Sequence, residues 1–257
     1  MTKPDCLLLR RRLVDWLSSY LEGAGKSGYV IGLSGGIDSL TLSLLGNEVA
    51  QRTNKRFLAI ISKIDPTYDY TDNEYATRVV DMYGLPHEFL DLTEPYAALK
   101  NVLPASSRPV TYTNLKARLR TAVFYYYANN HDLLMLGTVN RGEFMIGYFP
   151  KNASAGDILP MAGLSKQEIR GVAETYGVPA ELRYRKSSGC IFAPTAEEEW
   201  GFTEDELDVM CEHNHTSSAD ALPGIPNETL DRFALMYKAS KHKRHFPPKF
   251  NKLRNGG

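Results

Sequence analysis

The residues with the clearest chemical meaning form one glycine-containing loop, Ser34-Gly35-Gly36-Ile37-Asp38-Ser39. An apolar run at residues 29–33 precedes it and predicts a buried strand, and leucines at helical spacing follow it at residues 40–47. The first N–H groups of a helix have no intrahelical partner and lie at the positive end of its dipole. The two glycines let the main chain approach a phosphate, the two serines offer hydroxyl donors, and Asp38 can hold a divalent cation. The loop therefore predicts an anion site, and the alternative is a tight turn that only caps a helix.

The elements that must position this loop alternate along the first two thirds of the chain. This alternation predicts an α/β fold, a Rossmann-like parallel sheet with helices on both faces, formed by one domain over residues 1–257. The expected strands are residues 29–33, 57–61, 88–92 and 133–136, and the expected helices include residues 6–21, 71–83 and 113–129.

Capping boxes mark three predicted helix starts. In each box a hydroxyl residue is followed three positions later by a glutamate, and each of the two side chains accepts from a free main-chain N–H group. The three pairs are Thr71 with Glu74, Ser165 with Glu168 and Thr203 with Glu206.

Two further segments carry polar side chains at useful spacing. Asn114 and Arg118 lie four residues apart, so they share one side of a helix, where an amide and a guanidinium can bind one anionic or amide-bearing ligand. Thr138 and Glu143 follow the predicted strand at residues 133–136, at the carboxyl edge where open α/β sheets bind ligands. Taken singly, Arg118 fits a solvated helix face and Glu143 an ordinary surface acid.

The loop is not a Walker A sequence, and it resembles the S-G-G-x-D-S pyrophosphate loop of the N-type ATP pyrophosphatases. With the later matches to N-x-x-A-R-x-R, G-T-x-N-x-x-E, L-x-K-x-x-[VI]-R and a late H-K-R, the chain resembles ammonia-dependent NAD synthetases over nearly its whole length. The resemblance implies an adenine nucleotide alpha hydrolase-like fold and a homodimer. It also implies a role for each matched residue. The implied catalytic residues are Asp38, Lys151 and Lys186; the ATP-binding residues are Ser34, Gly35, Gly36, Ile37, Asp38, Ser39, Thr138 and Lys166; the substrate-binding residues are Asn114, Arg118, Asp157, His242 and Lys243; and the Mg²⁺ ligands are Asp38 and Glu143.

The reaction implied by this resemblance is the amidation of deamido-NAD. ATP adenylates the carboxylate, pyrophosphate leaves with help from Mg²⁺, and ammonia then displaces AMP to give NAD. No segment of these 257 residues resembles a glutaminase, so free ammonia or a separate ammonia supplier is the expected nitrogen source.

Three segments depart from the family pattern, at residues 150–157, 187–191 and 194–199, on the side that handles the acid. Two alternatives therefore stay open: a related adenylating ligase for another carboxylate, and a non-catalytic nucleotide-binding protein. Two single-residue alternatives also stay open, since Lys166 could be a solvated side chain and the run 242–244 a plain basic tail.

Composition limits the partners and the compartment. The chain has 30 basic and 30 acidic side chains, so its overall charge favours neither nucleic acid nor a membrane surface, and tRNA thiolation is disfavoured further by the lack of a C-x-x-C pair. Its three cysteines form no disulfide pattern and are expected to be packing residues. No apolar run approaches the length of a membrane span, and a cytoplasmic protein is expected.

Overall fold

The computed structural model describes residues 2–65, 69–153, 156–189, 194–213 and 222–245. Within these ranges four strands form one parallel sheet in the order β3-β2-β1-β4. The bounds are β1 Gly28–Gly32, β2 Arg56–Lys63, β3 His87–Asp91 and β4 Leu134–Met135. β1 pairs with β2 on one side and with β4 on the other. The strand order changes direction between β1 and β4, so the loops that follow these two strands border the usual ligand crevice of this fold class.

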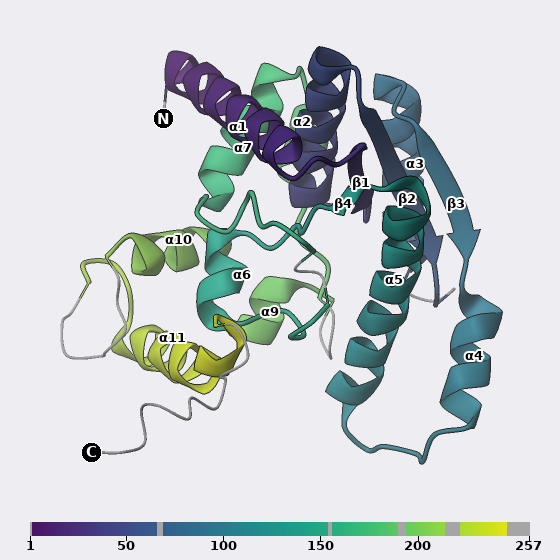
Figure 1. Cartoon of the computed structure of the whole chain (residues 1–257). Coiled ribbons are helices and arrows are strands. Elements are labelled where there is room, and N and C mark those ends of the chain that lie inside the picture. Colours follow the sequence, from purple (N-terminus) through teal and green to yellow (C-terminus); the bar gives the residue numbers. More distant parts are fainter. Residues whose placement is uncertain (1, 66–68, 154–155, 190–193, 214–221, 246–257) are drawn as a thin grey trace, which may run out of the picture.

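Helices cover both faces of the sheet, as the sequence predicts. Val30 and Ile60 point to the face covered by Phe124 and Ala128 of α5, and Ile31 belongs to the larger core on the opposite face. Figure 1 shows α5 on one side of the strands and α2 on the other. The larger core joins α2 and α3 to the sheet, and α1 and α7 pack on α2 from outside. These helices are α1 Lys3–Gly23, α2 Ile37–Thr53, α3 Asp69–Tyr83, α5 Pro109–His131 and α7 Lys166–Thr175, with the shorter α4 Thr93–Asn101 and α8 Ala180–Arg183.

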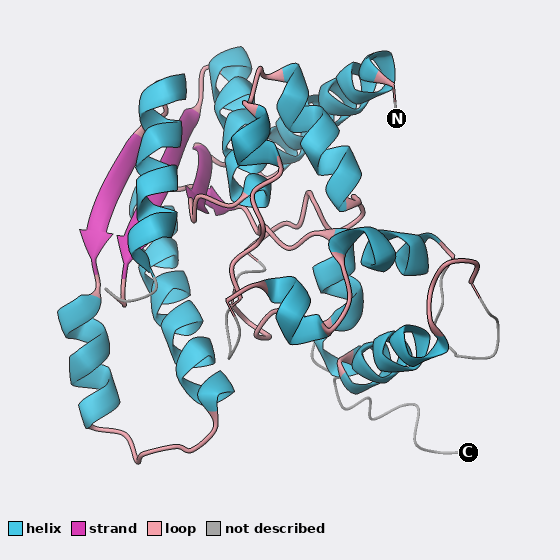
Figure 2. Cartoon of the chain, turned by 180° about the vertical axis from the view of Figure 1, so that it is seen from behind, coloured by secondary structure: helices cyan, strands magenta, loops and turns pink. Residues whose placement is uncertain are grey.

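A second core lies outside the sheet and is built from helices and the turns that connect them. Trp200, Met210 and Phe233 are buried in it, and the ring of Trp200 meets the ring of Tyr148 edge-on at 5.2 Å. Figure 2 shows this group of helices beside the layered part of the molecule. It consists of α6 Arg141–Ile146, α9 Ala196–Trp200, α10 Glu204–Glu212 and α11 Asn227–Ala239, followed by the 3₁₀ turn η1 Lys241–Lys243. Helix α10 contacts both α6 and α7, so this core is joined to the sheet layer.

Two of the three predicted capping boxes are confirmed. Ser165 caps α7 and Thr203 caps α10, each with its reciprocal glutamate. The prediction at Thr71 is wrong, because α3 begins earlier, at Asp69. The helix thus starts two residues before the predicted cap, less than one turn, and a short local pattern fixes a helix boundary no more closely than that.

In the described part of the chain, no helix combines the length and the apolar character that crossing a membrane requires.

Candidate functional site

The backbone of the glycine loop is shaped for close approach. Gly35 has φ +81°, a conformation that favours glycine, and a Cβ atom there would overlap the carbonyl oxygen of Asp72 in α3. Gly36 is the N-cap of α2 and provides no side-chain cap, so the first N–H groups of α2 remain available to an anion.

Hydroxyl groups hold the loop together from within. The Ser34 N–H donates to Ser39 Oγ at 3.2 Å, and Ser39 Oγ donates to the carbonyl of Gly36 at 3.0 Å. The hydroxyl of Ser39 is therefore engaged in shaping the loop, and Ser34 Oγ lies beside it at 3.1 Å. The sequence predicted both as ligand donors, and the structure adds this internal role.

Asp38 is the charged centre of the loop. Its Oδ2 accepts from Lys166 Nζ at 2.7 Å and from Asn140 Nδ2 at 3.4 Å. Its Oδ1 is buried without a hydrogen-bond partner in the described ranges. A buried carboxylate oxygen without a partner is costly, so a cation or another donor at this point would stabilise it.

Glu143 lies beside Asp38 because α6 starts with a capping box. Asn140 Oδ1 accepts from the Glu143 N–H at 2.9 Å, and Glu143 Oε2 accepts from the Asn140 N–H at 3.2 Å. Burial and the neighbouring charge of Asp38 raise the pKa of Glu143 to about 8. Two acids that repel each other in one recess form a place where a divalent cation would be favoured.

Lys166 is buried, with 4% of its side chain exposed, so the solvated alternative is wrong. Its ammonium group contacts Asp38 Oδ2 at 2.7 Å and Glu204 Oε1 at 3.3 Å. Burial works against its charge, but the carboxylates of Asp38, Glu204 and Glu143 outweigh that effect and raise the pKa of Lys166. Lys166 therefore carries a positive charge beside the glycine loop.

Three residues of this network had no functional prediction. Glu204 accepts from Arg170 Nη2 at 2.5 Å, and Asp208 accepts from the N–H groups of Lys166 and Gln167 at 3.2 Å and 3.3 Å. Asn140 is the asparagine of the G-T-x-N-x-x-E motif, but the sequence alone predicts no role for it. The sequence around Glu204 and Asp208 predicts an amphipathic helix with an acidic first turn, and nothing in that pattern indicates which acids face the loop.

A second basic group forms where α5 meets the end of the described chain. Arg118 donates to the carbonyl of Lys151 at 3.5 Å and to that of Asn114 at 3.3 Å. Lys151 Nζ donates to the carbonyl of His242 at 2.5 Å, and Lys243 Nζ donates to that of Gly147 at 2.7 Å. Burial lowers the pKa of Lys243, and the nearby charge of Arg118 lowers it further. The run 242–244 is thus docked on the protein and is not a solvated tail.

The remaining predicted residues lie around these two groups. Asp157 holds β4, since its Oδ2 accepts from the Met135 N–H at 2.7 Å and its Oδ1 from the Tyr125 hydroxyl at 3.2 Å. Thr138 follows β4, two residues before the Asn140 cap. Lys186 is 71% exposed and pairs with Glu197 at 3.2 Å, so the structure does not bring it to Asp38. Part of two altered segments, residues 154–155 and 190–191, lies outside the described residues.

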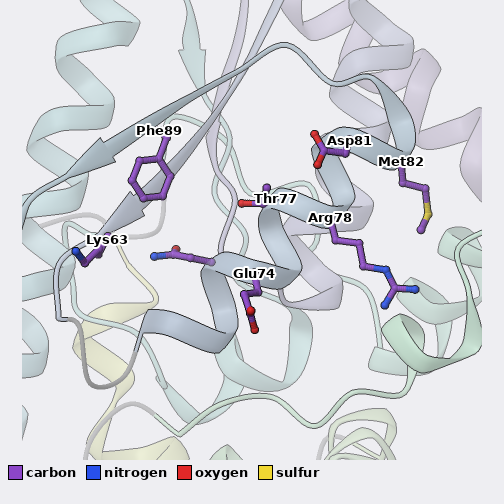
Figure 3. Close-up of a pocket in the computed structure, with 8 residues that line it drawn as sticks. Lys63, Glu74, Thr77, Arg78, Asp81, Met82 and Phe89 are labelled. Carbon is purple, nitrogen blue, oxygen red and sulfur yellow. The ribbon is translucent and has the colours of Figure 1, made fainter.

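One surface pocket lies apart from this network, between α3 and β3 (Figure 3). Its lining residues come from these elements and the end of β2, and none of them contacts Asp38. The candidate site is therefore defined by the charged network at the loop. The lining residues are Lys63, Asn73, Glu74, Thr77, Arg78, Asp81, Met82 and Phe89.

Comparison with known proteins agrees with this geometry. The profile of the family described as NAD synthase matches residues 9–247. The chain belongs to the NAD synthase family. An NH₃-dependent NAD⁺ synthetase of Aeropyrum pernix is 34% identical over an alignment of 251 residues, and the match covers 93% of this chain and 87% of that protein. One of Finegoldia magna is 35% identical over 241 residues, which are 93% of each chain.

Among solved structures, an NMN synthetase from Francisella tularensis superposes with a TM-score of 0.84 and 27% identity, covering 98% of this chain and 99% of that one. These matches confirm the predicted family and the adenine nucleotide alpha hydrolase-like fold, and the match spans both the sheet layer and the helical core of this NAD synthase family member.

Proposed function

We propose that this chain is an ATP-dependent amide ligase that converts deamido-NAD to NAD with ammonia. The observation that carries the proposal is the family match over residues 9–247, with relatives named NH₃-dependent NAD⁺ synthetase, joined to a phosphate loop whose Asp38 meets a buried lysine.

The chemistry follows from the charges at the loop. A carboxylate oxygen of the acid attacks the α-phosphorus of ATP, the bond to the bridging oxygen breaks, and pyrophosphate leaves. The free N–H groups of α2 and the ammonium of Lys166 stabilise the negative charge that pyrophosphate carries. Ammonia then attacks the acyl carbon, AMP leaves, and a proton is released.

Asp38 and Glu143 would hold Mg²⁺. The unpartnered Oδ1 of Asp38 and the raised pKa of Glu143 both fit a cation in this recess. In the described ranges no group of three or more His, Cys, Asp or Glu side chains is arranged to hold a metal, so these two acids would bind the cation together with ligands from outside the protein. Bound Mg²⁺ would neutralise charge on the phosphates, and phosphate oxygens and water would complete its shell.

The basic group of Arg118, Lys151 and Lys243 supports the binding of a nucleotide acid as the second substrate. These cations come from α5, the segment after α6 and η1, so they form one positive region suited to a phosphate-bearing acid. We infer that Asn114, Arg118 and His242 contact the acid, and that a homodimer and a cytoplasmic location accompany this function.

A second acid is favoured by one specific observation. The Francisella tularensis structure with a TM-score of 0.84 is an NMN synthetase, so the mononucleotide acid that corresponds to NMN is the alternative substrate. Both acids present the same nicotinate carboxylate to the same ATP loop, and they differ in the adenylate half that the dinucleotide adds.

The experiment is an assay of AMP and pyrophosphate with the purified chain, ATP, Mg²⁺ and ammonium. Deamido-NAD, the mononucleotide acid and free nicotinate are supplied in parallel, and Asp38→Asn serves as the inactive control. NAD formed at a higher kcat/KM than NMN supports the first acid, and the reverse order supports the second. If no pyrophosphate is released with either nucleotide acid, both proposed substrates are wrong. The chain then acts on another carboxylate or has a non-catalytic role.

A further inference from the structure

Glu204 connects the phosphate loop to the helical core through one buried carboxylate. The residue is 7% exposed, and both of its carboxylate oxygens are engaged. Oε1 accepts from Ser187 Oγ at 2.7 Å and lies 3.3 Å from Lys166 Nζ, while Oε2 accepts from Arg170 at 2.5 Å. Its main-chain N–H donates to Glu197 Oε1 at 3.0 Å, which fixes the start of α10.

The charges along this line alternate. Asp38, Lys166, Glu204 and Arg170 follow each other as acid, base, acid and base, with contacts of 2.7, 3.3 and 2.5 Å. Lys166 is thus shared by two carboxylates, and the contact with Asp38 is the shorter one. A buried lysine with a single acidic partner would depend on that acid entirely, because an unpaired buried charge is costly.

The second acidic partner of Lys166 becomes important when Asp38 binds a divalent cation. A divalent cation at Asp38 Oδ1 shares the carboxylate with Lys166, which contacts Oδ2, and the two positive charges repel each other. With Glu204 in place, Lys166 retains an acidic partner while Asp38 binds the cation. Without it, Asp38 is the acid in contact with the buried ammonium, and a cation bound at Oδ1 weakens that contact.

We propose that Glu204 is a positioning residue, whose carboxylate holds the Lys166 ammonium beside the phosphate loop so that Asp38 is free to bind the divalent cation that accompanies ATP. The inference rests on the proposed function for the identity of ATP and the cation, but not for the identity of the acid. Arg170 holds Glu204 in turn, and Ser187 ties the network to the segment that follows α8.

The test is calorimetric titration of ATP into the wild-type chain and Glu204→Gln, at a series of Mg²⁺ concentrations and in EDTA. In Glu204→Gln we expect the Mg²⁺ concentration that supports half-maximal ATP affinity to rise on the order of tenfold, because one charge-assisted contact is lost. In EDTA we expect ATP to bind no more weakly than to the wild type, because the variant has one negative charge fewer near a polyanion.

The matched control is Asp205→Asn, the next residue of α10. Asp205 is 72% exposed and lies 3.9 Å from Arg170, so the variant removes the same charge from the same helix without touching Lys166. We expect its Mg²⁺ requirement to match the wild type.

A second variant guards against loss of folding. Arg170→Met with Glu204→Met removes both members of a buried ion pair, a change that proteins often tolerate, and it keeps the net charge. We expect the same rise in the Mg²⁺ requirement. The inference is overturned if both variants keep the wild-type requirement, or if ATP affinity falls equally with and without Mg²⁺, as a purely structural role predicts.

Failure of the proposed function is distinguishable. A wild-type chain that binds ATP with Mg²⁺ but amidates neither nicotinate acid would refute the proposed reaction and leave this test intact. A wild-type chain whose binding of ATP is independent of Mg²⁺ would overturn the inference, whichever acid is the substrate.

Discussion

Lys166 and Asp38 stand 128 residues apart in the sequence, and their side chains meet at 2.7 Å, with Lys166 Nζ donating to Asp38 Oδ2. This pair joins the start of α7 to the start of α2, and both helices point their N-terminal ends toward it. The uncapped N–H groups at the start of α2 and the ammonium of Lys166 thus lie beside the glycine loop, whereas the first N–H groups of α7 are capped by Asp208. A positive side chain next to a free helix N-terminus favours an anion.

Asp38→Asn should abolish pyrophosphate release while the fold persists. The change removes the charge that pairs with Lys166 and that would bind the cation, and losing such a contact costs about 3 kcal/mol or more in the transition state. The measurement is pyrophosphate release under saturating ATP, with circular dichroism to check folding. Asp15→Asn is the control, because Asp15 is an exposed acid that pairs with Arg52. Near wild-type turnover in Asp38→Asn would refute the loop assignment.

Gly35→Ala should weaken both folding and ATP binding. A Cβ at Gly35 overlaps the Asp72 carbonyl, and the positive φ adds about 1–2 kcal/mol of strain. Gly25→Ala is the matched control, since Gly25 also has a positive φ of +64° but has open space around its Cβ position. The two variants are compared by urea unfolding and ATP titration. If Gly35→Ala and Gly25→Ala lower the stability and the ATP affinity by equal amounts, the contact between Gly35 and α3 is unimportant.

Glu143 should make the metal-free protein less stable as the pH rises. Its pKa is about 8 in the folded protein against an ordinary value of 4.5, so between these two values the folded state binds more protons than the unfolded state. The free energy of unfolding therefore falls as the pH rises through that window, by at most about 1.4 kcal/mol per pH unit, and levels off above it.

Urea unfolding in EDTA at several pH values measures this slope for the wild type and for Glu143→Gln. Burial raises the pKa of Asp208 as well, so the difference between the two proteins is the relevant quantity. Parallel pH profiles for the wild type and the variant would show that Glu143 ionises normally in the folded state.

Arg118→Ala should raise the Kd for the acid by at least about tenfold, with little change in ATP affinity. Arg118 lies with Lys151 and Lys243 in the second basic group, away from the Asp38 network. Arg118→Lys should recover part of the loss, because it keeps the charge but not the planar guanidinium. The measurement is calorimetry with ATP and with each acid separately. If Arg118→Ala lowers the affinity for ATP as much as the affinity for the acid, Arg118 is not specific to the acid site.

Ammonium, and not glutamine, should support the reaction of the purified chain. The motive is the match to relatives named NH₃-dependent NAD⁺ synthetase at 34% and 35% identity. The rate of amide formation is compared for the two nitrogen donors, with glutamine freed of ammonia beforehand. Equal rates would contradict the prediction.

Much of the fold was predictable because its signals are local. The apolar strands, the glycine loop between β1 and α2, and the capping boxes at Ser165 and Thr203 each depend on residues close together in the chain. The box at Thr71 shows the limit of such signals. The side chain of Asp72, one residue on, instead binds Arg185 and Ser188, which are more than 100 residues away.

The sequence by itself determined the family and the place of the glycine loop between β1 and α2, because motif order and local backbone conformation depend on neighbouring residues. The tertiary structure alone decided that Lys166 is buried between Asp38 and Glu204, that Lys186 pairs with Glu197 at the surface, and that Lys243 docks beside Arg118. Burial and charge pairing depend on which helix faces another across the core, and a helical pattern of acids and bases fits many such arrangements equally well.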